Sequence, residues 1–242
     1  MKHLRDKHKG QMAFLIGGGT SLISVNEERL RDYITITVNS GILFCPCCDY
    51  FVSDDPAISN WTYYEDVWES PCTKLLYKDR FASICKKKKN VVLYTHTWWF
   101  SPKGNKYNMD GLRLKKKEPI IGSRTSMGSA LHLAYILGCD PIILLGNDCK
   151  LSRDGKRYFW QYWPKKKQPK KVKGHIFGTR TQNIGFSKHD FTSYWEYFYK
   201  VNEDILGKDV EIIDGSDSTL QCFPKMEVIE ILGKYGKRKN EE

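Results

Sequence analysis

Short runs of apolar residues recur along the chain, and each run ends in glycine or in polar residues. Five of these runs have the length of buried strands and lie at residues 12–16, 33–38, 50–53, 91–94 and 141–145. The first run stops at three glycines, and the others reach asparagine, aspartate or histidine within two residues. Apolar runs of this length are typical of sheets that are covered on both faces. We therefore predict five strands with polar residues at their carboxyl ends.

Helical spacing lies between the predicted strands. Residues 126–138 carry apolar side chains three and four positions apart, and Gly138 is placed to end a helix there. Asn26 is placed to cap a shorter helix with acids in its first turn. The sequence also predicts a short helix or loose arm over residues 1–10, helices over 191–206 and 226–232, and a strand over 210–213. Strands that alternate with helices favour an α/β, Rossmann-like fold with a mostly parallel sheet flanked by helices.

Length and composition fit this fold class. The chain has 242 residues, of which 40% are hydrophobic, so a disordered or fibrous chain is excluded and one domain over residues 1–242 is expected. We expect no membrane span and a cytoplasmic location, because no apolar run approaches about 18 residues and residues 1–10 lack the apolar part of a secretory signal. The eight cysteines are irregularly spaced, which favours reduced thiols. Cys45, Cys47 and Cys48 lack the second pair typical of structural zinc sites.

Charge is concentrated in one segment. The formal net charge is +11, and residues 150–173 contain ten basic residues and one acid around the aromatic centre YFWQYW. We expect a basic aromatic insertion over residues 150–190, acting as a lid over a bound phosphate group or as a nucleic-acid-binding loop. A solvated insertion without a ligand is the alternative. The candidate nucleic-acid-binding residues are Arg157, Trp160, Lys165, Lys166 and Lys167, because cations bind phosphates and rings stack on bases.

The glycine run at the first strand end is a candidate phosphate site. Gly17, Gly18 and Gly19 allow the backbone to approach an anion closely, and the amides that follow are available as donors. The segment is not a P-loop, since no Gly-Lys-Ser or Gly-Lys-Thr follows it. A tight turn without a ligand is the alternative interpretation.

Three motifs together carry a family resemblance. They read GGGTSL from residue 17, VN from residue 38, and TSMGSALHLAYILGCDPIILLGND over residues 125–148. They resemble the motifs of bacterial sialyltransferases of glycosyltransferase family 42 and those of the related 6-hydroxymethylpterin diphosphokinase-like family of archaeal type. Both families have a Rossmann-like nucleotide site. This chain departs from the sialyltransferase pattern at Gly18, Thr20 and Met127, where those proteins have asparagine, proline and glycine.

The resemblance implies a donor-nucleotide site at the strand ends. Its motif positions correspond here to Gly17, Gly19, Ser21, Asn39, Ser126 and Asp148, and the candidate donor site as a whole also includes Gly18, Thr20, Asp55, Gly128, Gly146 and Asn147. Asp148 is in addition a candidate catalytic residue. The implied ligand is a nucleotide sugar, and the implied reaction is transfer of its glycosyl group to a hydroxyl acceptor.

The catalytic base is less clearly marked. The sialyltransferases have a histidine in a Gly-His-Ser-Lys motif, and this chain has Phe186 at that position. We expect His189, with Asp190 beside it, to serve as the base, because a neutral imidazole accepts protons near pH 7. His175 and His96 are rival candidates, and a surface or capping role is the alternative for each.

Three functional hypotheses follow from these motifs. The first is a glycosyltransferase, with a hydroxymethylated base in DNA as one candidate acceptor. The second is a diphosphokinase that acts on a hydroxymethyl heterocycle, in which Asp54 and Asp55 bind Mg²⁺ with the donor phosphates; an aspartate pair that starts a turn is the alternative. The third is a nucleic-acid-binding protein whose nucleotide fold is catalytically silent.

Overall fold

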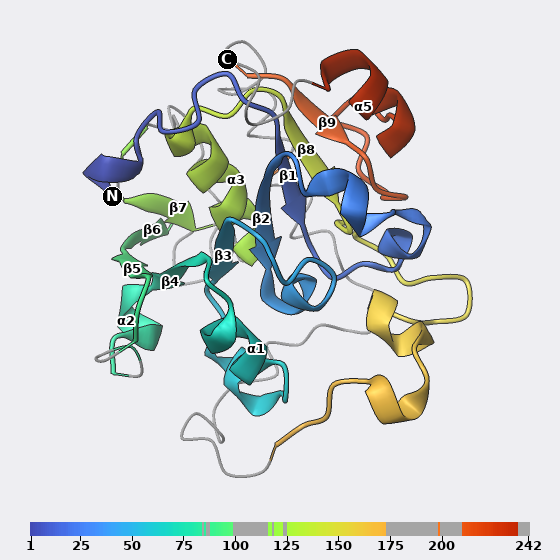
Figure 1. The fold of residues 1–242 in the computed structure, drawn as a ribbon, viewed down its shortest axis with the longest axis horizontal. Coiled ribbons are helices and arrows are strands. Elements are labelled where there is room, and N and C mark those ends of the chain that lie inside the picture. The colour runs from blue at the N-terminus through green and yellow to red at the C-terminus, as the bar shows by residue number, and fades with distance from the viewer. Residues whose placement is uncertain are drawn as a thin grey trace, which may run out of the picture.

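The computed structural model describes residues 1–83, 85, 88–98, 116–117, 119–122, 125–172, 198 and 210–236. A seven-stranded sheet runs through the molecule (Figure 1). Its strands are β1 Ala13–Ile16, β2 Ile34–Val38, β3 Tyr50–Ser53, β4 Thr73–Tyr77, β5 Val91–Tyr94, β8 Ile142–Leu145 and β9 Ile212–Asp214. The order is β5-β4-β3-β2-β1-β8-β9, and every neighbouring pair is parallel. The predicted α/β, Rossmann-like class is confirmed.

Both faces of the sheet are covered, which explains the uninterrupted apolar strands. In β1, Ala13 and Leu15 belong to the core on one face, whereas Phe14 and Ile16 belong to the core on the other. The first face is covered mainly by α3 (Ser126–Leu137), which is buried along its whole length and packs on β1, β2 and β3. Thr125 caps the start of α3, and Gly138, at φ 80°, ends it as predicted.

Shorter elements complete the fold. The other regular helices are α1 Tyr64–Glu69, α2 Lys78–Phe81 and α5 Val228–Tyr235, and the 3₁₀ helices are Lys2–Leu4, Thr20–Ser24, Glu27–Leu30, Asn39–Leu43, Pro56–Asn60, Phe159–Tyr162 and Lys165–Lys167. Leu4 belongs to the core of the first face. The helix predicted after Asn26 is one of these 3₁₀ turns, and the Asn26 side chain caps it by accepting a hydrogen bond from the Glu28 amide. A separate parallel pair joins β6 (His96–Trp98) to β7 (Ile120–Gly122).

The five strands predicted from apolar runs all exist, with bounds shifted by one residue at most. Strand β4 and the β6–β7 pair were not predicted. The predicted helix over residues 191–206 lies outside the described part of the chain except for Phe198, which is buried. No helix in the described residues is long and apolar enough to cross a membrane.

The strand order identifies one position where a ligand site is expected. From β1 the chain proceeds outward through β2 to β5, and it returns to the other side of β1 with β8. In open α/β sheets, ligands bind outside the carboxyl ends of the strands at such a reversal. The turns after β1 and β8 therefore lie at the expected site.

Candidate functional site

The turns after β1 and β8 are joined by backbone hydrogen bonds. The Gly17 amide donates to the Leu145 carbonyl at 2.8 Å, and the Gly19 amide donates to the Gly146 carbonyl at 2.8 Å. A Cβ at Gly17 would lie 2.5 Å from the Gly146 oxygen, and one at Gly19 would lie 2.5 Å from Asp148 Cγ. Glycine is required at both positions because the two turns leave no room for a side chain.

Asp148 ties the glycine turn to β8. Its carboxylate accepts hydrogen bonds from Thr20 Oγ1 at 3.1 Å, the Ser21 amide at 3.0 Å and Ser21 Oγ at 2.5 Å. The residue is buried, so the charge is stabilised by these donors and not by water. The structure thus brings together Gly17, Gly19, Ser21 and Asp148 as predicted, and it gives Asp148 a positioning contact with the turn.

Asn147 lies between this turn and a second one. Its amide donates to Ser216 Oγ at 3.0 Å, and Ser216 Oγ donates in turn to the Leu144 carbonyl. The Nδ2 atom of Asn147 is buried and has no hydrogen-bond partner in the part of the chain that the structure describes. A buried donor of this kind is costly unless a ligand or water satisfies it.

The turn after β9 was missed in the sequence. Asp214 accepts hydrogen bonds from the Ser216 amide at 2.9 Å and from Ser218 Oγ, and burial raises the pKa of its carboxyl. The Thr219 amide donates to the Asp148 carbonyl at 3.1 Å. The available signal was the run of small polar residues DGSDS after an apolar strand. This turn supports Asn147 and Asp148 from the far side.

The turns after β2 and β3 meet the start of α3. Asn39, at φ 50°, accepts a hydrogen bond from Ser53 Oγ at 2.8 Å. Ser126 Oγ accepts one from the Asp54 amide at 3.0 Å, and the Gly128 amide donates to the Thr125 carbonyl and side chain. Asn39, Ser126 and Gly128 therefore lie along the same carboxyl edge as the glycine turn, as expected for the proposed nucleotide site.

The adjacent carboxylates of Asp54 and Asp55 have different contacts. Asp54 accepts hydrogen bonds from Tyr94 OH and from Ser129 Oγ at 2.7 Å, and its Oδ1 lies 3.3 Å from His96 Nε2. Asp55 is exposed, and it caps a 3₁₀ helix by accepting from the Ala57 amide at 2.9 Å.

These contacts bear on the predicted Mg²⁺ site. Asp54 accepts donor hydrogens from Tyr94 and Ser129, and Asp55 accepts one from a helix amide, so the two carboxylates are engaged in separate contacts. No group of three or more metal-ligating side chains is present among the described residues. The Mg²⁺ site at Asp54 and Asp55 stays a prediction.

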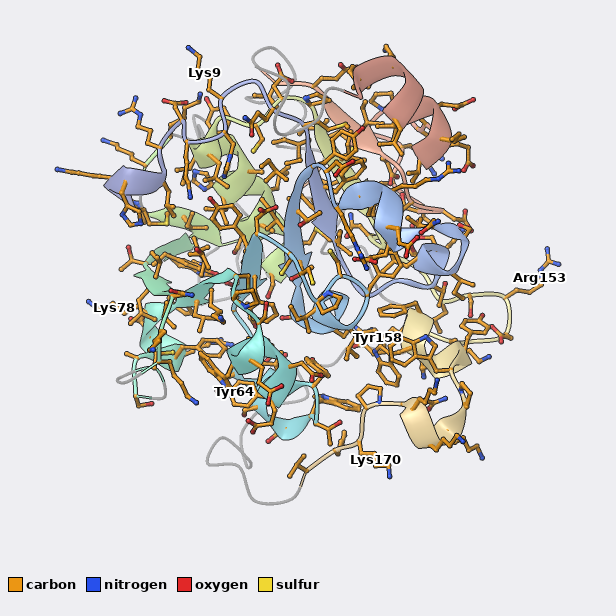
Figure 2. All side chains as sticks on the ribbon, in the orientation of Figure 1. Lys9, Tyr64, Lys78, Arg153, Tyr158 and Lys170 are labelled. Carbon is orange, nitrogen blue, oxygen red and sulfur yellow. The ribbon has the colours of Figure 1, made fainter. Side chains whose placement is uncertain are left out.

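The basic aromatic insertion, described up to residue 172, lies against the glycine turn. The Phe159 amide donates to the Gly18 carbonyl at 3.1 Å, and a Cβ at Gly18 would lie 3.2 Å from the Tyr158 ring. At its other end the Val172 amide donates to the Asn60 carbonyl at 2.8 Å. In Figure 2, Tyr158 lies against the body of the molecule, while Arg153 points away from it. The described part of the insertion is therefore bound to the rest of the molecule at Phe159 and at Val172.

Trp160 requires a correction. The sequence predicts a ring on which a base stacks, but Trp160 is buried, with its ring 5.1 Å from that of Tyr158 and 5.6 Å from that of Trp61. The side chain packs in the core because the 3₁₀ helix Phe159–Tyr162 turns it inward. By contrast, the three lysines of the 3₁₀ helix Lys165–Lys167 are all exposed. The Arg157 guanidinium lies 5.4 Å from the centre of the Tyr158 ring.

The predicted base is outside the described residues. His189, Asp190, His175 and Phe186 all fall in the part of the chain that the structure does not describe. The role of His189 with Asp190 stays a prediction. The described rival, His96, belongs to the buried contacts of Asp54.

Comparisons with known proteins support the fold. No family model and no curated protein matches the chain. Among solved structures, the chain is similar to the MAf glycosyltransferase from Magnetospirillum magneticum AMB-1, with a TM-score of 0.52 and 14% sequence identity. The match covers 93% of this chain and 37% of that one, so this chain spans little more than a third of its length. The likeness shows that the two proteins share an α/β, Rossmann-like fold.

Proposed function

We propose that this protein is a glycosyltransferase that binds a nucleotide-activated sugar at residues 17–21 and 146–148 and transfers the glycosyl group to a hydroxyl acceptor. One observation carries the proposal: a glycine turn without room for side chains lies at the reversal of strand order, where α/β sheets bind ligands. The similarity to a glycosyltransferase fold supports it.

The turn also has donors for a phosphate group. The amides of Gly17 and Gly19 are used within the protein, whereas those of Gly18 and Thr20 have no protein acceptor in the described part of the chain. Backbone amides in a glycine turn stabilise an anion without desolvating a charged side chain. The unpartnered Nδ2 of Asn147 adds a third donor after β8.

The test is a panel of CMP-, UDP- and GDP-sugars, with binding measured by calorimetry and hydrolysis by mass spectrometry. We expect one nucleotide class to bind and to be hydrolysed slowly in the absence of an acceptor. The Gly18→Val variant is expected to lose this binding, because its side chain would meet Ser40 Oγ and the Tyr158 ring. Failure of every donor to bind the unaltered protein would contradict the proposal.

We also propose that the molecule carrying the acceptor hydroxyl is a polyanion, such as DNA with hydroxymethylated bases. The exposed lysines Lys165, Lys166 and Lys167 carry this proposal, since no carboxylate in the described residues forms an ion pair with them. Replacement of all three by alanine is expected to weaken DNA binding and to lower its salt slope by about 0.9 for each phosphate that is no longer neutralised. An unchanged slope would contradict the DNA acceptor alone.

A further inference from the structure

A group of side chains at the carboxyl edge of the sheet is not used by the proposed donor site. Asp54 follows β3, Tyr94 ends β5, His96 begins β6, and Ser129 lies in the second turn of α3. The sequence separates these residues by up to 75 positions. The fold brings two hydrogen-bond donors and the His96 imidazole onto the Asp54 carboxylate.

His96 and Ser129 have further contacts besides those with Asp54. The ring of His96 is stacked on that of Tyr77, with centroids 4.2 Å apart and an interplanar angle of 10°. Its Nε2 also lies 3.4 Å from Ser129 Oγ. Burial and the charge of Asp54 raise the pKa of Tyr94 well above its usual value, so its hydroxyl stays protonated and donates. The carboxylate orientation is therefore fixed.

The carboxylate retains capacity for one more hydrogen bond. An ionised carboxylate has about four lone-pair sites. Tyr94 and Ser129 donate hydrogen bonds to two of them, and His96 Nε2 lies 3.3 Å from Oδ1. The His96 side chain is 0% exposed, whereas that of Asp54 is 16% exposed. Any molecule in solvent that reaches this group therefore meets Asp54 and not the imidazole.

This carboxylate is close to the proposed donor site. The Asp54 amide donates to Ser126 Oγ, and the next residue, Met127, has its Cε atom 2.9 Å from the position of a Cβ at Gly17. The Asp54 backbone and the glycine turn therefore both approach the first residues of α3, at the carboxyl edge of the sheet. This shared position connects Asp54 to the proposed donor site.

We propose that Asp54 accepts the proton of the acceptor hydroxyl, an inference that rests on the function proposed above. As the acceptor oxygen bonds to the anomeric carbon of the donor sugar, the bond from that carbon to the phosphate oxygen breaks. The nucleotide leaves with the electron pair, and the hydroxyl proton passes to the free lone pair of Asp54. His96, Tyr94 and Ser129 are positioning residues, because they act only through the carboxylate.

The decisive comparison is between Asp54→Asn and Asp32→Asn. The two variants make the same chemical change, but Asp32 is exposed and precedes β2, at the edge of the sheet opposite the candidate site. With the CMP-, UDP- or GDP-sugar that the protein hydrolyses, Asp54→Asn is expected to lower kcat about 100-fold or more while leaving the nucleotide Kd unchanged. Asp32→Asn is expected to match the unaltered protein in both.

Two further variants separate catalysis from stability. In Asp54→Ala, sodium formate is expected to restore part of the hydrolysis, because an added carboxylate replaces the missing base. Ser129→Ala removes one donor and is expected to lower kcat with no change in nucleotide Kd, which keeps the inference testable if the Asp54 variants do not fold.

The outcomes distinguish this inference from the proposed function. If the unaltered protein binds and hydrolyses a nucleotide sugar while Asp54→Asn and Ser129→Ala retain full kcat, the role of Asp54 is overturned and the proposed function stands. Loss of hydrolysis in His189→Ala together with full activity in Asp54→Asn would assign the proton to His189 instead. Absence of nucleotide binding by the unaltered protein would overturn both.

Discussion

Asp148 and Asp54 are carboxylates at the same edge of one sheet, and three polar groups surround each of them. The donors of Asp148 all come from residues 20–21, so the carboxylate fixes one short segment of backbone. The groups around Asp54 come from β5, β6 and α3, which are far apart in sequence. Asp148 is 5% exposed as a residue, whereas the Asp54 side chain keeps an opening to solvent.

This difference separates two tasks that a transferase needs. Asp148 is buried and hydrogen-bonded to one turn, so it shapes a binding surface and is closed to solvent. Asp54 is held by three elements and its side chain is 16% exposed, so under our proposal it accepts a proton from outside. The following variants test whether the two sides behave differently, beginning with the largest expected change in stability.

Asp148→Ala is expected to have the largest effect. It leaves Thr20 Oγ1 and both donors of Ser21 without their acceptor, which costs about 2–3 kcal/mol of unfolding free energy. Nucleotide binding should be lost with the shape of the turn. Urea unfolding and calorimetry measure the two effects, and Asp217→Asn is the control because Asp217 is 81% exposed. A variant with wild-type stability would show that the three contacts are weak.

Gly17→Ala comes next on the same side. The added Cβ would lie 2.5 Å from the Gly146 oxygen, a backbone atom that moves only with β8, so we expect a loss of about 1–3 kcal/mol. Gly233→Ala is the matched control in α5, where nothing lies within 4 Å of the new methyl. We expect Gly233→Ala to raise the unfolding free energy by up to about 1 kcal/mol, since alanine is the better helix former. Equal effects in the two variants would show that the turn is not tightly packed.

The sequence predicted the donor side better than the Asp54 side, for a physical reason. Glycine turns and apolar strands are local patterns, so Gly17, Gly19 and five strands could be read from neighbouring residues. The fate of Asp54 depends on Tyr94 and His96, which only the fold brings close. The sequence predicted Asp55 for the donor site and Asp54 only as a metal ligand beside it, whereas the structure gives the two carboxylates different contacts.

Two errors have the same origin. Strand β4 was missed because it contains Lys74, yet this lysine is buried and donates to the carbonyls of Ser70 and Cys72. Trp160 was predicted to face a ligand because it lies among lysines, yet its neighbours in space are Tyr158 and Trp61. In both cases the polar or charged surroundings in sequence did not reveal the contacts that bury the residue.

Thr125→Ala tests the Asp54 side through the start of α3. The Thr125 side chain accepts hydrogen bonds from the amides of Met127 and Gly128, and loss of such a cap costs about 1 kcal/mol. The cap holds Gly128, which belongs to the candidate nucleotide site, and the same turn carries Ser129, which contacts Asp54. We therefore expect turnover to fall and nucleotide Kd to rise modestly in Thr125→Ala. Thr125→Ser retains the cap and should behave as the unaltered protein. An unchanged turnover in Thr125→Ala would show that the cap does not position Ser129.

The smallest effect should be a pH dependence on the donor side. Burial raises the pKa of Asp214 above the ordinary value of 3.8, so the folded protein holds this proton more tightly than the unfolded chain does. Stability from this group is therefore fully present below pH 3.8 and is lost as the pH rises through the folded pKa.

Asp214→Asn cannot ionise, and its unfolding free energy should fall less steeply above pH 3.8 than that of the unaltered protein. Parallel urea titrations across this range measure the difference, and Asp217→Asn, which alters an exposed carboxylate, should keep the original slope. Identical slopes for Asp214→Asn and the unaltered protein would mean that Asp214 has the same pKa in the folded and unfolded states. The turn after β9 would then support Asn147 and Asp148 without a proton held on Asp214.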